Sequence, residues 1–289
     1  MSVTFGQIYH KAKQRLAEAG CESPAFDVIQ LMDTVFHISR EQLAVRGEEA
    51  VPEEMLDQFL HLVKRRAAGY PLQYLVGRWE FMGLPFQVGE GVLIPRADTE
   101  VLCERVLEFL KGKESPRVLD LCSGSGALAI SIARFCPGAQ VTALEKSADA
   151  MEYLGKNAQL NGVQVEMLEG DMLLDPPELG KFDVIVCNPP YIPSYELETL
   201  PTELSYEPAM ALDGGGDGLV FYRALVQNWL KLLKEEGLLA VEIGSEQGQS
   251  VKDLFCHHDL RQVRVCKDLA GLDRVVLGVF GCNESGDTV

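Results

Sequence analysis

Apolar residues recur at two different spacings along the chain, and each spacing predicts its own kind of secondary structure. Over the first 75 residues they return every three or four positions, as at positions 28, 31, 32 and 35. This is the period of an amphipathic helix, so the region is predicted to be helical throughout. An early threonine and a Ser-Pro pair supply signals for helix starts. The expected helices run from Thr4 to Gly20, from Ser23 onward and from about Pro52 onward.

From residue 117 onward, short apolar runs alternate with segments long enough to form helices. Strands separated by helices pair in parallel, whereas the last two runs are joined by only a few residues and should pair as an antiparallel hairpin. The expected fold is α/β: a Rossmann-like, doubly wound sheet of seven strands with an antiparallel C-terminal hairpin. The predicted strands cover residues 117–121, 140–145, 163–171, 182–187, 237–244, 262–268 and 274–280, with helices over 127–135 and 147–160.

A short segment rich in glycine and proline separates the two regions. Gly83, Pro85, Gly89 and Gly91 interrupt its apolar runs, which predicts a β-hairpin linker. Asp98 then stands in position to cap a helix over residues 101–110. The predicted domains are a helical substrate-recognition domain over residues 1–75, a hairpin linker over 76–96 and a catalytic domain over 97–289.

Composition narrows the class of protein. Hydrophobic residues make up 47% of the 289 positions, yet none of the apolar runs reaches the ~20 residues that cross a bilayer, and the first residues lack the apolar core of a signal peptide. The eight cysteines form no C-x-x-C pair, so we expect reduced thiols in a cytoplasmic protein. Because Cys and His ligands are not clustered, no metal site is predicted.

The charge of the chain argues against a nucleic-acid partner. The formal net charge is −17, whereas proteins that bind phosphates normally present a basic face. The one basic cluster, Lys64-Arg65-Arg66, falls at the end of a predicted helix, where positive charge interacts favourably with the helix dipole. Direct binding of nucleic acid is therefore disfavoured, and no membrane partner is expected.

Acidic and glycine residues gather at the ends of the first three predicted strands. Asp120, Gly124 and Gly126 close the first strand and open a helix, and glycine lets a backbone turn tightly and approach a ligand. Ligands of doubly wound sheets bind outside the carboxyl ends of the strands. Glu145, at the end of the second strand, is placed to accept hydrogen bonds from ribose hydroxyls, and Asp171, at the end of the third, from an adenine amino group.

The glycine pattern by itself leaves several classes of protein open. The stretch GSGALA also fits the dinucleotide fingerprint G-x-G-x-x-A, so a nicotinamide enzyme and a non-catalytic nucleotide-binding fold both remain. An acid before the loop, an acid at the end of each of the next two strands and the antiparallel hairpin favour a methyltransferase. A second glycine-rich stretch, residues 214–218, is not followed by Lys-Ser/Thr; it is therefore no P-loop and is predicted to be a surface loop.

The stretch Asn188-Pro189-Pro190-Tyr191 follows the fourth predicted strand and therefore lies in a loop at the carboxyl edge. Prolines carry no N–H group, so the stretch offers acceptors without competing donors. The Asn188 side-chain oxygen and the Pro189 carbonyl can accept both hydrogens of an NH₂ group, and Tyr191 supplies a flat wall. These contacts would aim a poorly nucleophilic, delocalised nitrogen at a methyl donor. The motif predicts methylation of a planar NH₂ group, but it does not separate adenine, guanine and glutamine.

Five stretches of the sequence carry a resemblance to a known family: RRAAGYPLQYLVGRWEFMGLPF, VLIPRADTE, DLCSGSGALAIS, FDVIVCNPPYIP and LSYEPAMALDGGGDGLVFYR. Together they make the chain similar to the peptide chain release factor glutamine methyltransferases (the HemK/PrmC type). The resemblance implies transfer of a methyl group from S-adenosylmethionine, leaving S-adenosylhomocysteine. The implied acceptor is the side-chain amide nitrogen of the glutamine in the Gly-Gly-Gln motif of class 1 release factors, and a monomer is expected.

The resemblance also implies roles for individual residues. The Cys122–Gly126 loop holds the cofactor; the substrate residues follow the fourth strand; and a lid closes over the cofactor. Three positions depart from the family pattern: Ala97 lies where the family often has Pro, Glu145 where Asp is common, and Cys122 where Gly is frequent. These departures affect only the fine geometry of the site. The implied cofactor residues are Cys122, Ser123, Gly124, Ser125, Gly126, Glu145, Asp171, Met172 and Asn188; the implied catalytic residues are Asn188, Pro189, Pro190 and Tyr191; the lid residues are Arg96, Thr99 and Glu100.

Three other functions share parts of this pattern. A glutamine methyltransferase acting on a ribosomal protein would use the same site. A DNA or RNA amino-group methyltransferase would use the same Asn-Pro-Pro-Tyr motif, although the acidity of the chain opposes it. A non-catalytic module that senses the methyl donor would need only the cofactor residues.

Overall fold

The computed structural model describes residues 3–281. The outermost ends of the first and last predicted domains, and Cys282, lie outside the described residues. The chain divides into two compact units: one comprises the chain up to Arg78 together with Pro201–Tyr206, and the other comprises Trp79–Leu200 and the chain from Glu207 onward. No helix among the described residues is both long enough and apolar enough to cross a membrane.

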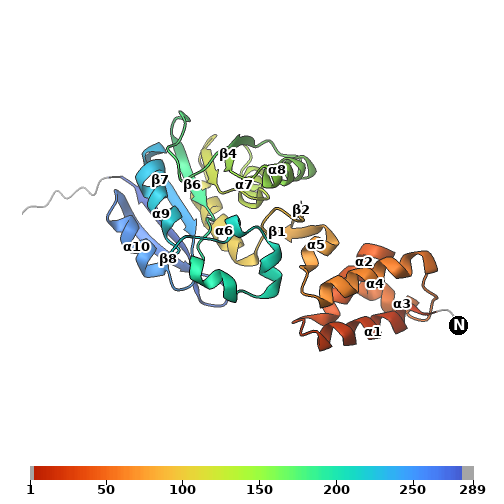
Figure 1. Cartoon of the computed structure of the whole chain (residues 1–289). Coiled ribbons are helices and arrows are strands. Elements are labelled where there is room, and N and C mark those ends of the chain that lie inside the picture. Colours follow the sequence, from red (N-terminus) through yellow and green to blue (C-terminus); the bar gives the residue numbers. More distant parts are fainter. Residues whose placement is uncertain (1–2, 282–289) are drawn as a thin grey trace, which may run out of the picture. The chain divides into compact units, whose positions relative to one another are not determined.

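The N-terminal unit is a bundle of helices (Figure 1). The Thr4 side chain accepts a hydrogen bond from the Gln7 N–H group, and the Gln7 side-chain oxygen accepts one from the Thr4 N–H group. This capping box starts the first helix where the sequence predicts it. Pro24 begins the second helix, also as predicted. The two shortest helices of this unit, α3 (Arg40–Arg46) and α5 (Leu72–Val76), were not predicted, because five to seven residues show too little periodicity. The helices are α1 (Phe5–Glu18), α2 (Pro24–Phe36), α3 (Arg40–Arg46), α4 (Glu53–Ala67) and α5 (Leu72–Val76).

A distant segment of the chain also packs into this helical unit. Arg66 is buried and forms ion pairs with Asp27 at 2.7 Å and with Glu203 at 2.6 Å. The rings of Tyr70 and Tyr206 lie edge to face with centroids 4.9 Å apart. Residues 201–206 therefore belong to the helical unit although they follow the fourth predicted strand by more than a dozen positions, which the sequence pattern did not reveal.

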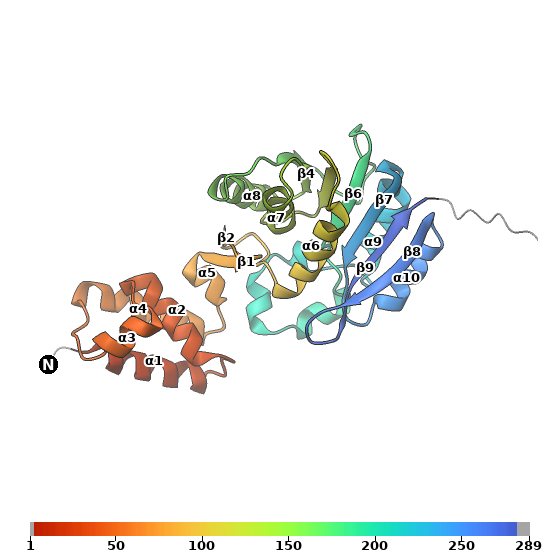
Figure 2. The same cartoon turned by 180° about the vertical axis from the view of Figure 1, so that it is seen from behind.

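The second unit is built on a seven-stranded sheet, which confirms the predicted fold class. Its order is β5-β4-β3-β6-β7-β9-β8, and β9 pairs antiparallel with both of its neighbours (Figure 2). The predicted strands agree with those observed to within two residues at each end, except that β5 is shorter than the predicted 163–171 and β7 begins four residues before the predicted 237. The strands are β3 (Arg117–Leu121), β4 (Gln140–Glu145), β5 (Glu166–Glu169), β6 (Phe182–Cys187), β7 (Leu233–Glu242), β8 (Leu260–Lys267) and β9 (Asp273–Phe280).

Helices cover both faces of the sheet. Because side chains alternate along a strand, Val118 packs against helices on one face and the adjacent Leu119 against helices on the other. The first face carries α6 (Ala97–Leu110), α7 (Ala127–Phe135) and α8 (Ala148–Leu160), and the second carries α9 (Val220–Ala224) and α10 (Gly248–Cys256) (Figures 1 and 2). The prediction that Asp98 caps a helix beginning at residue 101 was wrong: Arg96 is the cap residue, and Asp98 lies in the first turn of α6.

The predicted hairpin is present as β1 (Arg78–Phe81) and β2 (Leu84–Gln87). Phe81 and Phe86 are buried in the core beneath α6. Asn157 of α8 ties the hairpin down further, because it accepts a hydrogen bond from the Gln87 N–H group at 2.6 Å and donates one to the Gln87 carbonyl at 3.1 Å. The segment after the hairpin is thereby anchored beside the sheet.

Parallel pairing brings three loops to one edge. In the register of the sheet Leu121 at the end of β3 pairs with Leu144 of β4 and with Cys187 of β6. The loops that follow these strands therefore emerge next to one another, with β3 in the middle. This edge is where a doubly wound sheet binds its ligands.

A buried carboxyl group supports the first of these loops. Asp120 is fully buried, and its Oδ2 accepts a hydrogen bond from the Ala129 N–H group in the first turn of α7 at 3.1 Å. Its Oδ1 has no hydrogen-bond partner within residues 3–281. Burial raises the pKa of Asp120 to about 8, because the charged form loses its hydration.

Replacing this carboxyl group should change how stability depends on pH. The pKa of Asp120 is higher in the folded chain than its unperturbed value of ~4, so its contribution to stability is present at low pH and is lost as pH rises through about 8. Between pH ~4 and about 8, the free energy of unfolding of the wild type should fall by up to about 1.4 kcal/mol per pH unit relative to that of Asp120→Asn. Denaturant unfolding at several pH values measures the difference.

Asp183→Asn is the matched control. Although partial burial opposes it, the hydrogen bond from Lys234 lowers the pKa of Asp183, so its contribution is lost only in acid. This variant should keep the wild-type slope across neutral pH. Equal slopes in wild type and Asp120→Asn would contradict the assignment of a raised pKa to Asp120.

Candidate active site

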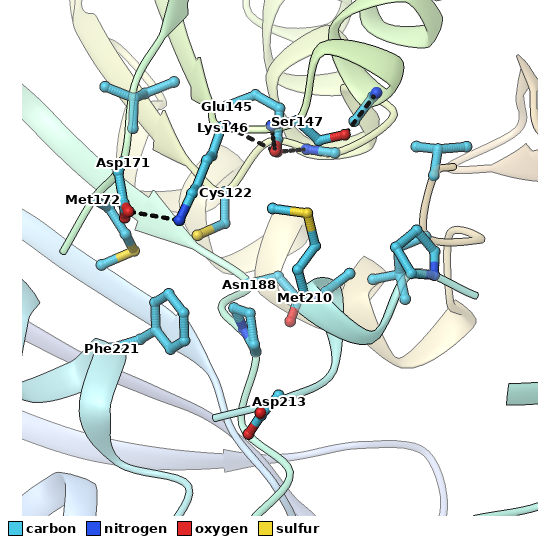
Figure 3. Close-up of a pocket in the computed structure, with 18 of the residues that line it drawn as sticks. Cys122, Glu145, Lys146, Ser147, Asp171, Met172, Asn188, Met210, Asp213 and Phe221 are labelled. Atoms are coloured by element: carbon cyan, nitrogen blue, oxygen red, sulfur yellow. Dashed lines mark hydrogen bonds and ion pairs between the residues drawn. The ribbon is translucent and has the colours of Figure 1, made fainter. Parts of the chain in front are cut away.

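The loops that follow β3, β4, β5 and β6 surround one pocket of about 960 Å³, part of which is open to solvent (Figure 3). The Lys146–Asp171 pair, Met172 and Phe221 lie on one side of it, and Met210 lies on the opposite side. The lining residues come from the segment after the hairpin, from the ends of β3, β4, β5 and β6, and from residues that follow the helical-unit segment. They are Gly91, Val92, Leu93, Cys122, Gly124, Leu144, Glu145, Lys146, Ser147, Ala150, Gly170, Asp171, Met172, Leu173, Asn188, Pro190, Pro208, Met210, Ala211, Asp213 and Phe221.

The loop after β3 has an unusual backbone. Gly124 and Gly126 have φ of 53° and 83°, and Cys122 has φ of 57°, a conformation that glycine adopts far more readily. A Cβ atom on Gly126 would lie 2.7 Å from Cδ1 of Ile130, so a side chain there would disturb α7. Ser123 steadies the loop, because its hydroxyl donates to the Asp120 carbonyl at 2.9 Å. Cys122 and Gly124 consequently line the pocket with little side-chain bulk.

Glu145 connects the first two loops. Its Oε2 accepts a hydrogen bond from the Gly124 N–H group, and its Oε1 accepts from the N–H groups of Lys146 and Ser147, each at 2.8 Å. A carboxylate offers about four acceptor positions, so three are already used by the backbone. Glu145 therefore shapes the pocket wall as well as presenting a negative charge to the pocket.

Asp171 lies two residues beyond β5 and pairs with Lys146 at 2.8 Å. Although partial burial opposes it, the hydrogen bond from Lys146 lowers the pKa of Asp171. Met172 beside it is buried, its carbonyl accepts from the Trp229 indole at 2.7 Å, and its sulfur lies 3.8 Å from Sγ of Cys187. The pair and Met172 thus form one firm side of the pocket.

The Asn-Pro-Pro-Tyr motif, which follows β6, lies at the base of the pocket. Asn188 follows β6 directly and lines the pocket, and its Nδ2 donates to the Thr99 hydroxyl oxygen at 3.2 Å. Pro189 and Pro190 are buried, and Pro190 also lines the pocket. The Tyr191 hydroxyl donates to Oε1 of Glu242 at 3.2 Å, and burial raises the pKa of that phenol well above its usual range. The hydroxyl of Tyr191 is therefore engaged in a contact behind the motif, and its ring packs against the core of the sheet and is not among the residues that line the pocket.

The three predicted lid residues have different surroundings. Arg96 forms an ion pair with the buried carboxylate of Glu207, which also accepts a hydrogen bond from the Ile94 N–H group at 3.0 Å. Thr99 is buried behind Asn188. Glu100 instead accepts a hydrogen bond from the Met82 N–H group at 2.6 Å in the hairpin turn. The structure brings Arg96 and Thr99 to a second, smaller pocket, partly open to solvent, that adjoins Asn188 and the Cys122–Gly126 loop.

The prediction that residues 214–218 form a surface loop holds for Gly216 and Asp217, which are exposed, but not for the two ends of the stretch. Gly214 and Gly218 are buried against the backbone of Tyr191. The Gly214 N–H group donates to the Ile192 carbonyl at 2.8 Å, and the Ser194 N–H group donates to the Gly215 carbonyl at 2.9 Å. Glycine is needed at position 214 because a Cβ atom there would lie 2.7 Å from Cα of Tyr191. The stretch clamps the Asn-Pro-Pro-Tyr loop from behind.

Several pocket residues carry no chemical signal in the sequence. Met210 and Phe221 supply apolar wall, and Lys146 supplies the cation that pairs with Asp171. Met210 and Phe221 do lie within the stretch LSYEPAMALDGGGDGLVFYR, whose resemblance to the family could have marked them as site residues. Lys146 follows Glu145 directly and had no signal beyond that position.

Comparison with known proteins first gives the class. The chain matches the model of the methyltransferase small domain over residues 98–249. A solved 16S rRNA methyltransferase from T. thermophilus aligns with a TM-score of 0.51 and 22% identity over 71% of this chain and 50% of that one, which shows a shared fold. With the pocket at the carboxyl edge of this fold, the chain is a methyltransferase.

Closer relatives then give the family. Residues 7–77 match the PrmC N-terminal domain. The release factor glutamine methyltransferase of Moorella thermoacetica is 44% identical over 95% of this chain and 98% of that protein, and that of Geobacter sulfurreducens is 40% identical over 96% and 97%. A solved release-factor-specific protein-(glutamine-N5) methyltransferase from Alicyclobacillus acidocaldarius is 33% identical over 68% of this chain and 99% of that one, with a TM-score of 0.41. The chain belongs to the release factor glutamine methyltransferase family.

The clamp behind the Asn-Pro-Pro-Tyr loop yields a prediction. Gly214→Ala should push the Tyr191 backbone away and displace Asn188, and a misplacement of about 1 Å at a reacting centre costs roughly 100-fold in rate. We expect the methyl-transfer rate to fall on that scale while the fold survives with a loss of about 1–3 kcal/mol. Steady-state kinetics and thermal unfolding measure the two effects.

Gly216→Ala tests the same loop without the clash, because nothing lies within 4 Å of a Cβ atom at that position. This control should keep both rate and stability near wild type. Equal rates in the two variants would show that the clamp does not position the motif.

Proposed function

We propose that the protein transfers a methyl group from S-adenosylmethionine to the side-chain amide nitrogen of the glutamine in the Gly-Gly-Gln motif of class 1 release factors. The observation that carries the proposal is the placement of Asn188 in the wall of the pocket that also contains Glu145 and the Cys122–Gly126 loop. A donor held by the loop would present its methyl group to a nitrogen held by Asn188. The names of the relatives supply the acceptor protein.

The pocket suits this donor chemically. The glycine loop approaches without side-chain bulk, as a nucleoside requires, and Glu145 retains about one acceptor position for a ribose hydroxyl. Asp171 and Met172 line the same pocket and are the residues proposed to contact the adenine. The described lining residues include three acids, Glu145, Asp171 and Asp213, against one lysine, so the pocket favours a cation. When bound, S-adenosylmethionine supplies an electrophilic methyl group on a positively charged sulfur.

The substrate amide would lie against the Asn-Pro-Pro-Tyr loop. Because Nδ2 of Asn188 donates to Thr99, its Oδ1 is the atom left to accept from the substrate NH₂ group. The Pro189 carbonyl would accept the second hydrogen. These two acceptors raise electron density on the nitrogen and stabilise the positive charge that develops as its bond to the methyl carbon forms and the carbon–sulfur bond breaks. The nitrogen would become acidic at that point and would lose its proton to solvent water, to which the pocket is partly open, so no strong base is required.

A protein acceptor also agrees with the charge of the chain. A net charge of −17 opposes the approach of the phosphates of a nucleic-acid substrate. The helical unit is the proposed recognition domain, and Arg96, Thr99 and the Glu207 contact are the features proposed to shape the entrance beside Asn188. We propose that the enzyme acts as a cytoplasmic monomer without a metal; the described residues contain no cluster of metal-binding side chains.

A labelling experiment tests the function. The enzyme is incubated with radiolabelled S-adenosylmethionine and one of three acceptors: a class 1 release factor, its Gly-Gly-Ala variant, or a mixture of ribosomal proteins and RNA. Label should appear only in the intact release factor, with mass spectrometry placing the methyl group on the glutamine. Label in the ribosomal proteins or RNA instead would assign a different acceptor.

Asn188→Ala should abolish turnover while sparing donor binding. Removing the Oδ1 acceptor takes away a contact that strengthens as charge develops on nitrogen, and loss of one such contact typically costs ~10²–10³-fold in kcat. Calorimetry should show a donor Kd within about threefold of wild type. A kcat unchanged by the substitution would remove Asn188 from the catalytic role.

Glu145→Ala should act on the other end of the site. It removes the acceptor proposed for the ribose and frees the Gly124, Lys146 and Ser147 N–H groups, so donor affinity should fall by at least tenfold, roughly 1.4 kcal/mol. Glu169→Ala is the matched control, because Glu169 pairs with Glu145 in the sheet register but is exposed and does not line the pocket. Equal donor affinities in the two variants would contradict the assignment.

A further inference from the structure

A buried group of polar side chains lies behind Asn188 and contacts neither the donor nor the acceptor in the proposed function. Asn188 donates through Nδ2 to the Thr99 hydroxyl oxygen, and Tyr191 donates through its hydroxyl to Oε1 of Glu242, both at 3.2 Å. Thr99 is 4% exposed and Glu242, the last residue of β7, is 1% exposed. The second carboxyl oxygen of Glu242, Oε2, has no hydrogen bond of good geometry to any described residue. A buried carboxyl group that binds Tyr191 of the substrate motif and lies beside Thr99, the partner of Asn188, requires an explanation.

The single hydrogen of the Thr99 hydroxyl decides how Asn188 is oriented. Thr99 interacts with the Glu242 carboxyl group and lowers its pKa, as a hydroxyl does when it directs its hydrogen to a carboxylate. In our proposal that hydrogen is directed to the Glu242 carboxylate, and Thr99 then accepts from Asn188, as the hydrogen bond from Nδ2 of Asn188 to the Thr99 oxygen requires. The Asn188 amide must then turn its NH₂ group toward Thr99, which leaves Oδ1 for the substrate. The two ends of an amide have nearly the same shape, so this hydrogen-bond direction is what distinguishes them.

We propose that Glu242 is a positioning residue which, as a carboxylate, fixes the Thr99 hydroxyl and the Tyr191 ring and thereby presents Oδ1 of Asn188 to the substrate NH₂ group. The proposal rests on the proposed function and assigns to that site a group that touches neither donor nor acceptor. Its action passes through Thr99 and Tyr191 only.

The surroundings of Glu242 leave both of its protonation states accessible near neutral pH. Arg274 of β9 and Asp98 of α6 face it with opposite charges, Tyr191 donates to it, and Tyr222 of α9 donates to its backbone carbonyl at 2.8 Å. Arg274 also pairs with Asp268 at 3.1 Å, so its charge is shared. Burial raises the pKa of Glu242 to about 7, against the opposing effects of Thr99, Arg274 and Tyr191.

Protonation would reverse the direction of hydrogen bonding in this group. A protonated Glu242 becomes a donor to the Thr99 oxygen, and the Thr99 hydrogen is then free to point at Asn188. The Asn188 amide would then turn its oxygen toward Thr99 and its NH₂ group into the pocket. Two NH₂ groups, one from Asn188 and one from the substrate, would then face each other. The carboxylate is therefore the active form, and turnover should rise with pH through about 7.

Glu242→Gln is the first test, because glutamine keeps the shape of a protonated glutamate and cannot ionise. We expect kcat on a release factor to fall roughly 10- to 100-fold, the scale on which groups that orient a binding residue act at other sites. The Kd for S-adenosylmethionine and the KM for the release factor should stay within about threefold. The wild-type kcat should fall about tenfold per pH unit below pH 7, whereas the variant should lack this step between about pH 6 and 8.

Thr99 provides a second test that does not depend on the folding of the Glu242 variant. Thr99→Val removes the hydroxyl with little change of shape and should lose kcat to the same extent as Glu242→Gln. Thr99→Ser restores the hydroxyl and should recover most of that loss. The double variant Glu242→Gln/Thr99→Val should be no slower than Thr99→Val alone, because both substitutions interrupt the same group.

Each alternative result has a definite meaning. A wild-type kcat and pH profile in Glu242→Gln would overturn the proposal, as would equal rates in Thr99→Val and Thr99→Ser. A loss of donor affinity or of melting temperature that accounts for the lower rate would reduce Glu242 to a structural role. If the wild-type enzyme itself transferred nothing to a release factor, the proposed function would fail and the positioning role with it. Transfer by wild type with an unaffected variant would overturn the positioning role alone.

Discussion

Parallel pairing of β3 with β4 and β6 is the constraint on which the site depends. Because the three strands run in one direction in a shared register, Leu121, Glu145 and Cys187 end at the same edge, and the loops that follow them must meet. Residues separated by about 65 positions in sequence thereby line one pocket. Helices on both faces bury the sheet and hold this edge rigid, which is what transfer between two precisely placed atoms requires.

Carboxyl groups around the pocket perform different tasks according to their burial. Asp120 is fully buried and holds the start of α7, whereas Glu145 binds three backbone N–H groups and still faces the pocket. Glu207 secures the segment at Arg96, and Glu242 contacts the substrate motif from behind. Several acidic residues of this unit therefore stabilise its structure. The net charge alone does not indicate which of them would contact a ligand.

The stretches that carry the family resemblance have physical reasons for their composition. Glycine at 214 is required by close approach to the Tyr191 backbone, and Glu207 is required to bind both a backbone N–H group and Arg96. Between the motif and that clamp, residues 201–206 leave the sheet unit and pack with the helical unit. Neighbouring residues of one segment thus belong to different units: residues 201–206 to the helical unit, and Glu207 and Pro208 to the sheet unit.

The sequence by itself determined the fold class, because strand and helix periods follow from local burial and are visible without knowledge of partners. It also marked the loop at 122–126 and the motif at 188–191, since glycine and proline act on their own backbone. Tertiary structure alone decided what depends on distant neighbours: that Asp98 lies within a helix rather than capping it, that residues 214–218 pack against the Tyr191 backbone, and that Glu242 binds the Tyr191 hydroxyl. A buried polar contact leaves no periodic trace in the sequence, because its partner lies on another strand or helix.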